Sequence, residues 1–202
     1  GYLLLQKGQT DAAVESLSRA SALAPSDKCS LLLGQAYQNL GQFKEAIVEY
    51  KKLDINQSKN KIIPFNLGIC LLNTGDNVGA IEALKVAIQL DDSFIGAWGN
   101  LGTALLNEEK YQEALPAIKK VLALDPDNAT AHLNLGWIYK ELGQFDRALE
   151  STFKYLQFEN SCPGAYQNLG SIYKELGNLD QALASTIKSL ELKPDNPIAH
   201  MN

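Results

Sequence analysis

One spacing of 34 residues constrains the fold of this chain more than any other feature. The stretch NLGWIYKELGQFDRAL at residues 134–149 returns as NLGSIYKELGNLDQAL at residues 168–183. A glycine recurs at this interval, and an alanine follows each glycine by twelve residues. The glycines are Gly34, Gly68, Gly102, Gly136 and Gly170, the alanines are Ala46, Ala80, Ala114, Ala148 and Ala182, and Gly1 with Ala13 forms a further such pair. This periodicity predicts a repeat protein whose successive units stack on their neighbours.

Each unit has the pattern of two helices joined by a glycine turn. Leu135, Ile138 and Tyr139 recur at helical spacing before Gly143, and the pattern resumes over residues 145–156. The turn glycine has counterparts at Gly8, Gly41, Gly75 and Gly177, where a positive φ costs glycine little. Glu109 takes this place in the fourth unit, so we expect a strained or differently shaped turn there.

The recurring glycine and alanine lack bulk, so we expect them to let the paired helices approach closely. Ridges of side chains usually hold packed helices about 8–10 Å apart, and small residues allow the lower end of that range. A larger residue at either position would push the two helices apart. No single pair can bury its apolar faces alone, which is why neighbouring pairs must stack.

The 34-residue pattern resembles the tetratricopeptide repeat (TPR) family over essentially all 202 residues. The family's signature positions are matched by Trp98, Leu101 and Gly102, by Leu135, Gly136 and Tyr139, by Ala148 and Ala182, and by Pro126 and Pro194. The resemblance implies an all-α fold, a right-handed α-α superhelix (TPR solenoid) of about six helix-turn-helix repeats. We expect a single array over 1–202, with repeats at about 1–27 (partial), 28–60, 61–94, 95–128, 129–162 and 163–196, and the start of a seventh at 197–202. Because the first unit starts within a helix, we expect a segment of a longer array whose N-terminus is missing.

Prolines and one missing residue mark the places where we expect irregularity. Between Pro25 and Gly34 there is one residue fewer than at the same point of the fifth unit, which tightens the first junction. Pro64 is expected to delay the start of its helix, and Pro116 to remove a hydrogen bond to the Gln112 carbonyl and kink its helix. These features predict that the third and fourth units are the least regular part.

Composition argues against several classes of partner. The formal net charge is −5, from 18 Lys and Arg against 23 Asp and Glu, and the cations are scattered. A nucleic-acid surface needs clustered cations, so we expect no nucleic-acid partner. No apolar stretch approaches the roughly 20 residues that span a bilayer, so we expect no membrane insertion. Three cysteines without a CxxC pair argue against a disulfide framework, and we expect a cytoplasmic protein with Cys70 as a buried apolar residue.

The residues that catalysis needs do not converge in the sequence. His132 and His200, the two histidines, occupy the same repeat position as Trp98 and Tyr166, where packing against the next helix is the simpler interpretation. No phosphate-loop, HExxH or GxSxG motif occurs. We therefore expect no enzyme activity, no metal and no cofactor.

An asparagine row is the first candidate for a binding site. It consists of Asn66, Asn100, Asn134, Asn168 and Asn202, each two residues before the repeat glycine, and Leu32 interrupts it in the second unit. The resemblance places the first helix of each pair on the inner face of the superhelix, where carboxamides could clasp the backbone of an extended peptide. The row is similar to the asparagine ladder of the O-linked N-acetylglucosamine transferase. A local packing or capping role for these asparagines stays open.

The other inward positions vary along the array from apolar to polar. They comprise Phe65, Ile69 and Leu72 in the third unit, Gly99, Thr103 and Leu106 in the fourth, Leu133, Trp137 and Lys140 in the fifth, and Gln167, Ser171 and Lys174 in the sixth. An exposed Trp137 is the best single candidate for a binding hot spot, because tryptophan is enriched there. Partial burial of Trp137 between units is the alternative.

These observations predict a non-catalytic interaction scaffold that binds an extended peptide or protein segment in its concave groove. One alternative makes the array the substrate-recognition segment of a larger glycosyltransferase or other transferase. Another is an array that self-assembles end to end, because repeat arrays usually need polar caps to stay soluble.

Overall fold

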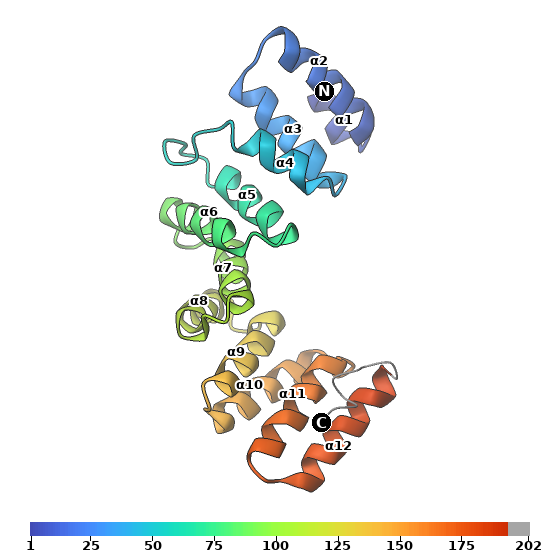
Figure 1. Cartoon of the computed structure of the whole chain (residues 1–202), viewed down its shortest axis with the longest axis vertical. Coiled ribbons are helices and arrows are strands. Elements are labelled where there is room, and N and C mark those ends of the chain that lie inside the picture. Colours follow the sequence, from blue (N-terminus) through green and yellow to red (C-terminus); the bar gives the residue numbers. More distant parts are fainter. Residues whose placement is uncertain (194–202) are drawn as a thin grey trace. The chain divides into compact units, whose positions relative to one another are not determined.

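The computed structural model describes residues 1–193, and every regular element in that part is an α-helix (Figure 1). The chain divides into two compact units, Gly1–Glu108 and Glu109–Asn202. The expectation of an all-α fold is confirmed. The seventh repeat start at 197–202, with His200 and Asn202, lies outside the described residues.

The first unit contains seven helices and the second contains five within the described part of the chain. In the first unit they are α1 (Tyr2–Gln6), α2 (Thr10–Leu23), α3 (Asp27–Asn39), α4 (Phe43–Tyr50), α5 (Ile62–Asn73), α6 (Asn77–Leu90) and α7 (Ile95–Asn107). In the second unit they are α8 (Tyr111–Leu124), α9 (Ala129–Glu141), α10 (Phe145–Phe158), α11 (Pro163–Glu175) and α12 (Leu179–Leu192).

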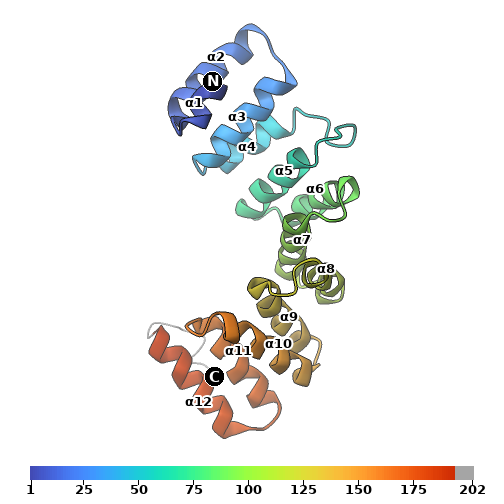
Figure 2. The same ribbon diagram turned by 180° about the vertical axis from the view of Figure 1, so that it is seen from behind.

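Helices that are consecutive in the chain pack on each other within each unit (Figure 2). The odd-numbered helices, which are the first of each pair, also contact one another directly. These contacts join α3 with α5 and α5 with α7 in the first unit, and α9 with α11 in the second. Within each unit the first helices therefore form a shared layer, and their outward side chains form one face. This face is called the first-helix face.

Left-handed residues form the turns between paired helices, as the sequence predicts. The φ angles of Gly8, Gly41, Gly75, Gly143 and Gly177 lie between 70° and 82°. Glu109 has a φ of 55°, so the fourth turn keeps the left-handed conformation without a glycine. The predicted strain is confirmed, because a side chain in this region crowds the backbone.

The repeat glycine makes room for the side chain sixteen residues later. A Cβ added to Gly34 would lie 2.6 Å from the Tyr50 ring, and one added to Gly136 would lie 2.4 Å from the Thr152 hydroxyl. Gly68 with Leu84 and Gly170 with Thr186 repeat this contact at 2.7 and 2.8 Å. The repeat alanines from Ala13 to Ala148 are completely buried. The small residues thus allow close packing as expected, and the side chain that uses the space lies four residues after the alanine.

The least regular part is the second helix pair, so the prediction of irregular third and fourth units is wrong. Helix α4 has 8 residues, whereas the second helices α6 and α8 have 14. Residues 51–61 follow α4 as a loop rich in turn-forming residues. The Asp54 carboxylate accepts hydrogen bonds from the backbone N–H groups of Asn56 and Gln57, and the Ser58 hydroxyl accepts one from that of Asn60. Such bonds compete with helix formation.

Pro64 delays the start of its helix as predicted, whereas Pro116 does not break its helix. Pro64 is the third residue of α5, where the missing N–H removes no helical hydrogen bond. Helix α5 begins one residue later in the repeat register than α7 and α9. Pro116 lies inside α8, which remains one 14-residue helix. The first junction is tightened as predicted, because three residues separate α2 from α3 and four separate α6 from α7.

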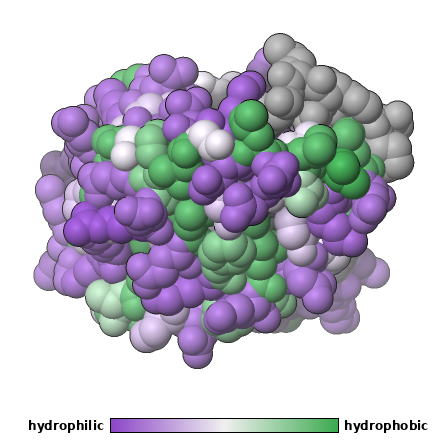
Figure 3. Space-filling model, turned by 90° about the horizontal axis from the view of Figure 1, so that it is seen from below, coloured by the Kyte–Doolittle hydropathy of each residue, from purple (hydrophilic) through white to green (hydrophobic). Residues whose placement is uncertain are grey.

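Helix α12 exposes apolar side chains at Leu179, Leu183 and Ile187. These residues are four apart, so they share one side of the helix. Figure 3 shows hydrophobic surface interspersed with hydrophilic surface on the face seen from below. Among residues 1–193, no helix has both the length and the apolar character needed to cross a bilayer.

Candidate functional site

Asn66, the first asparagine of the row, bonds to the preceding helix pair. Its Nδ2 donates to the Tyr50 hydroxyl at 3.3 Å, and that hydroxyl donates to Gln38 Oε1 at 2.9 Å. Tyr50 is completely buried, and burial raises the pKa of its phenol. Asn66 therefore completes a hydrogen-bond chain that links α3, α4 and α5.

Asn168 makes the same contact in the second unit. Its Nδ2 donates to the Thr152 hydroxyl at 3.0 Å, and that hydroxyl donates to the Ala148 carbonyl at 2.8 Å. The exposed fraction of Asn168 is 1%, and its Oδ1 has no hydrogen-bond partner among the described residues. Asn168 is therefore part of the packing between α10 and α11, and a ligand does not reach it.

The residue sixteen positions earlier decides what each asparagine does. Tyr50 and Thr152 offer hydroxyls to Asn66 and Asn168, whereas Leu84 lies sixteen residues before Asn100. The Asn100 Nδ2 instead donates to the Gly96 carbonyl of its own helix at 2.9 Å. Asn134, which follows Ile118 at the same interval, is half-buried, and Asn202 lies outside the described residues. The structure thus places the four described asparagines in different surroundings.

In the first unit, the predicted groove residue Phe65 packs against the loop after α6. Its ring centroid lies 4.5 Å from that of Phe94, and the Lys61 ammonium lies 4.8 Å from the Phe94 centroid. Lys61 also pairs with Asp91, and this bond with those from Ser93 lowers the pKa of Asp91 to about 2. These contacts give Phe65 a packing role.

The remaining predicted groove residues of the first unit are half-buried. Ile69 and Leu72 lie on α5 and Thr103 lies on α7. The Thr103 hydroxyl donates to the Gly99 carbonyl at 3.1 Å. On this part of the first-helix face the side chains are half-buried, so each exposes little surface to a ligand.

The predicted groove residues of the second unit form a more accessible site. Trp137 lies on α9 with 37% of its surface exposed. The Lys140 ammonium lies 4.8 Å from the centroid of the Trp137 ring and 2.7 Å from Glu141 Oε1. The cation holds the indole from one side, so the tryptophan presents an ordered, partly apolar surface.

Beside this pair, α9, the turn at Gly143, the start of α10 and α11 line a pocket of about 430 Å³, and three predicted groove residues belong to its lining. The three are Lys140, Ser171 and Lys174, and the other lining residues are Glu141, Gly143, Phe145 and Glu175. Two ammonium groups and two carboxylates balance each other in charge. The site on α9 and α11 formed by Trp137 and this pocket is called the Trp137 site.

Glu141 and Glu175 also line the pocket, although the sequence did not predict them as site residues. Their signal is the segment YKELG, which occurs in both near-identical copies and places a Lys-Glu pair before each turn glycine. Adjacent residues on a helix point in directions about 100° apart, so the periodicity assigns only one of the two to the inner face. The pocket lies at the end of the helix, where both the lysine and the glutamate of a pair can line it.

The aromatic side chains at the shared position of His132 and Trp98 bond to the backbone before their own helices. Trp98 Nε1 donates to the Asp92 carbonyl at 2.9 Å, and His132 Nε2 lies 2.9 Å from the Pro126 carbonyl. The buried His132 ring also stacks on Phe158. The packing interpretation of His132 is confirmed.

The part of the chain that the structure describes contains neither a cluster of metal-ligating side chains nor a paired cysteine. Across residues 1–193, no three His, Cys, Asp or Glu side chains are grouped so as to hold a metal ion. The cysteines are unpaired, and Cys70 is completely buried, as predicted. Burial raises the pKa of the Cys70 thiol to about 11, which keeps it protonated and unreactive at neutral pH.

Comparisons with solved structures identify several proteins of the same architecture. A crystal structure of MamA is 30% identical over 80% of this chain and 95% of that one, with a TM-score of 0.73. MamA from Desulfovibrio magneticus RS-1 is 23% identical over 85% of this chain and 97% of that one, with a TM-score of 0.77. YrrB, a TPR protein with an unusual peptide-binding site, is 19% identical over 94% and 98%, with a TM-score of 0.78. Among curated proteins, no sequence matches this one.

Family models agree with the structural comparisons. Three models described as tetratricopeptide repeat match the chain. One matches residues 1–60 and 31–93, a second matches 105–154 and a third matches 163–196. Together with the helix pairs, their turn residues and the similarity to MamA, these matches show that the chain belongs to the tetratricopeptide repeat family.

Proposed function

We propose that the chain is a protein-interaction scaffold that binds an extended peptide at the Trp137 site. The observation that carries this proposal is the exposed indole of Trp137, held by Lys140 at the edge of a pocket. Large aromatic side chains with a fixed geometry supply much contact area at low entropic cost, which is why binding energy concentrates on them. On the first-helix face of the second unit, Trp137 is the largest such side chain.

The surroundings of Trp137 suit a peptide with mixed chemistry. One peptide side chain can pack on the free face of the indole while its neighbour enters the pocket lined by Lys140, Ser171 and Lys174. Asn134 lies three residues before Trp137, on the same side of α9. In the proposed complex, its half-buried carboxamide bonds the peptide backbone. A peptide running from α9 to α11 would use all these groups.

The similar proteins support binding in general terms. YrrB has a peptide-binding site, and binding a peptide requires no catalytic residues. We propose the same for this chain, with a cytoplasmic location and with proteins or peptides, and no nucleic acid, as partners. A role as the substrate-recognition segment of a larger transferase is compatible with the same site, because presenting a peptide to a catalytic domain also requires holding it.

Self-association is a second candidate function, which the exposed side of α12 favours. Leu179, Leu183 and Ile187 are all about half exposed or more, and burying them against a second copy would stabilise a dimer through the hydrophobic effect. Leu183→Glu is then expected to shift the mass measured by light scattering toward the monomer. A mass that is monomeric in both proteins at high concentration would contradict this candidate.

Peptide selection tests the proposed peptide site. Peptides enriched from a random display library on the intact chain are expected to bind Trp137→Ala at least about 10-fold more weakly, the loss typical of a hot spot. Phe153→Ala is the matched control, because Phe153 is a 45% exposed aromatic residue on α10, a second helix. Equal affinities for the two variants would contradict the proposal.

The asparagine clasp needs a separate test at accessible positions. Asn168 is unsuitable because its replacement disturbs the packing with Thr152. Asn134→Ala removes a half-buried carboxamide from the second unit, and Asn100→Ala removes one whose Nδ2 bonds its own helix. If the asparagines clasp the peptide, the selected peptides are expected to bind the Asn134→Ala variant more weakly. Unchanged affinity in the double variant Asn100→Ala, Asn134→Ala would contradict the clasp and leave these asparagines with a packing role only.

A further inference from the structure

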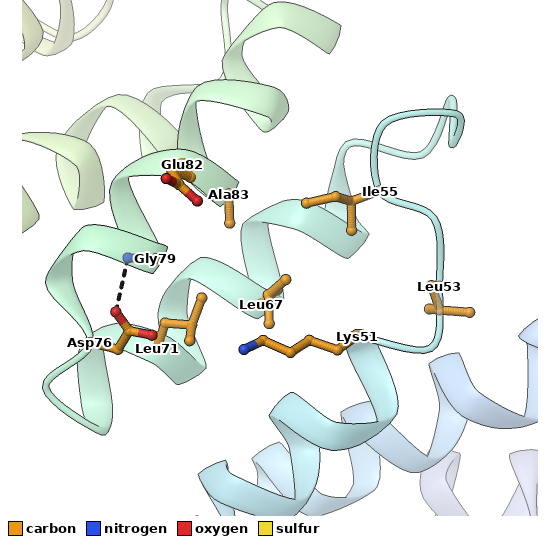
Figure 4. Close-up of a pocket in the computed structure, with 9 residues that line it drawn as sticks. All are labelled: Lys51, Leu53, Ile55, Leu67, Leu71, Asp76, Gly79, Glu82 and Ala83. Carbon is orange, nitrogen blue, oxygen red and sulfur yellow. Dashed lines mark hydrogen bonds between the residues drawn. The ribbon is translucent and has the colours of Figure 1, made fainter.

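The short helix α4 leaves a pocket on the first unit that the repeat pattern does not predict. The pocket has a volume of about 340 Å³ and lies between the loop after α4 and helices α5 and α6. Figure 4 shows Lys51, Leu53 and Ile55 on one side, Leu67 and Leu71 of α5 between, and Asp76 at the N-cap of α6 with Gly79, Glu82 and Ala83 of α6 on the other side. These nine residues define what is called the α4 gap.

Two departures from the repeat pattern open the α4 gap. Helix α4 ends at Tyr50, and the polar Asp54 stands in the loop where α6 has Ile88 and α8 has Leu122 at the same repeat position. The α4 gap therefore lies where a regular second helix would supply its last turns and an aliphatic side chain.

The second departure is Gly79, which replaces a long polar side chain. The corresponding residues of α4, α8, α10 and α12 are Glu45, Glu113, Arg147 and Gln181. A Cβ added to Gly79 would lie 2.8 Å from Asp76 Oδ2, because the Asp76 carboxylate folds over this position and accepts a hydrogen bond from the Gly79 N–H at 2.9 Å. Because Gly79 has no side chain, nothing from this position fills the α4 gap on its α6 side.

The charges around the α4 gap are arranged asymmetrically. Asp76 and Glu82 lie on the α6 side, and Lys51 extends across the opening from the end of α4 (Figure 4). Within residues 1–193, neither Lys51 nor Glu82 forms an ion pair. The apolar floor of Leu67, Leu71 and Ala83 thus has two carboxylates at one edge and a single ammonium group at the other.

We infer that the α4 gap is a docking site for a segment of a partner protein. The segment inserts a branched aliphatic side chain between α5 and α6, and this side chain stands in for the aliphatic residue, Ile88 or Leu122, that α6 and α8 carry at the repeat position of Asp54. It also places a lysine or arginine against Glu82 and Asp76. The apolar side chain supplies affinity through burial, and the cation supplies specificity through charge complementarity.

This docking site is distinct from the proposed peptide site. All nine lining residues belong to the first unit, and seven come from the second helix α6, its N-cap residue or the loop between α4 and α5. The Trp137 site consists entirely of residues from the second unit. The two sites therefore share no residue.

A subtractive peptide selection tests the inference. A random display library is selected on the intact chain in the presence of an excess of soluble Glu82→Lys protein, which removes peptides that bind elsewhere. The enriched peptides are expected to contain Leu, Ile or Val close to Lys or Arg. Their affinity for Glu82→Lys, measured by fluorescence anisotropy, is expected to be at least about 10-fold weaker, as for a close charge pair.

Matched variants show whether the loss of affinity is specific to the α4 gap. Glu150→Lys is the charge control, because Glu150 is exposed at the same repeat position on α10, and it is expected to leave the affinity unchanged. Trp137→Ala is also expected to leave it unchanged, so this test is independent of the proposed peptide site. Circular dichroism checks that both lysine variants fold.

Three outcomes would overturn the inference. The first is that no peptide distinguishes the intact chain from Glu82→Lys. The second is an equal loss of affinity in Glu150→Lys. The third is enrichment of acidic peptides that depend on Lys51 instead of Glu82.

Discussion

The bond between Asn168 and Thr152 gives the sharpest test of how neighbouring pairs are joined. Thr152 is completely buried and Asn168 nearly so, and their side chains are 3.0 Å apart. Thr152→Val keeps the shape of the side chain but leaves the Asn168 amide without its acceptor. An unpaired buried donor costs about 1–3 kcal/mol, so we expect the free energy of unfolding to fall by that amount.

The matching change, Asn168→Leu, is expected to cost less. It removes the donor together with the Oδ1 atom that lacks a partner, while the Thr152 hydroxyl keeps its bond to the Ala148 carbonyl. Replacing both polar groups by apolar groups of similar shape is nearly neutral in such pairs. The double variant is therefore expected to be more stable than the sum of the single effects predicts, by about 1–2 kcal/mol.

Urea denaturation of the four proteins, followed by circular dichroism, measures this coupling. The comparison requires equal denaturant slopes, because a changed slope means that a different amount of surface unfolds cooperatively. If the single effects add to within about 0.3 kcal/mol, the two side chains do not interact and the proposed role of Asn168 in packing is refuted.

Three further predictions concern a turn, a close contact and an ion pair. Glu109→Gly is expected to raise the free energy of unfolding by about 0.5–1 kcal/mol, because relief of the left-handed strain exceeds the gain in unfolded-chain entropy. A decrease would contradict the claim that Glu109 is strained at its φ of 55°. Gly34→Ala is expected to lower it by about 1–3 kcal/mol through overpacking against Tyr50, whereas an unchanged urea midpoint would show that the helices separate freely. Since folding lowers the pKa of Asp91 to about 2, its contribution to stability is present above about pH 4 and lost as the pH falls toward 2. The melting temperature of Asp91→Asn should therefore fall less steeply over that range than that of the unchanged protein, and parallel curves would contradict the pairing with Lys61.

The regular part of the fold could be predicted from the sequence because its physical causes are local. Turn glycines such as Gly143 are required by a left-handed φ, and the repeat glycines by close helix packing. The short α4 was missed because the glycine and alanine of its pair keep the repeat spacing. Its signal lies in Asp54 and Ser58, whose side chains bond to the nearby backbone and favour turns over helix.

The site was harder to predict because the role of a side chain depends on its neighbours in space. Asn66 and Asn100 occupy the same repeat position, yet one bonds to Tyr50 and the other to its own helix. Phe65 packs against Phe94, which lies 29 positions later in the chain. The 34-residue period does not predict this contact. Trp137 could be identified from the sequence because its position on the helix is enough to place it on the first-helix face. Knowledge of the residues around it in space was not needed.

The central claim, that a peptide binds at the Trp137 site, can be tested most directly by nuclear magnetic resonance. The chain has two tryptophans, so its indole N–H region should show two side-chain signals. During titration with a selected peptide, the Trp137 signal is expected to shift, while the Trp98 signal stays in place because its N–H is bonded to the Asp92 carbonyl. A shift of Trp98 alone, or saturation binding that moves neither signal, would contradict the claim.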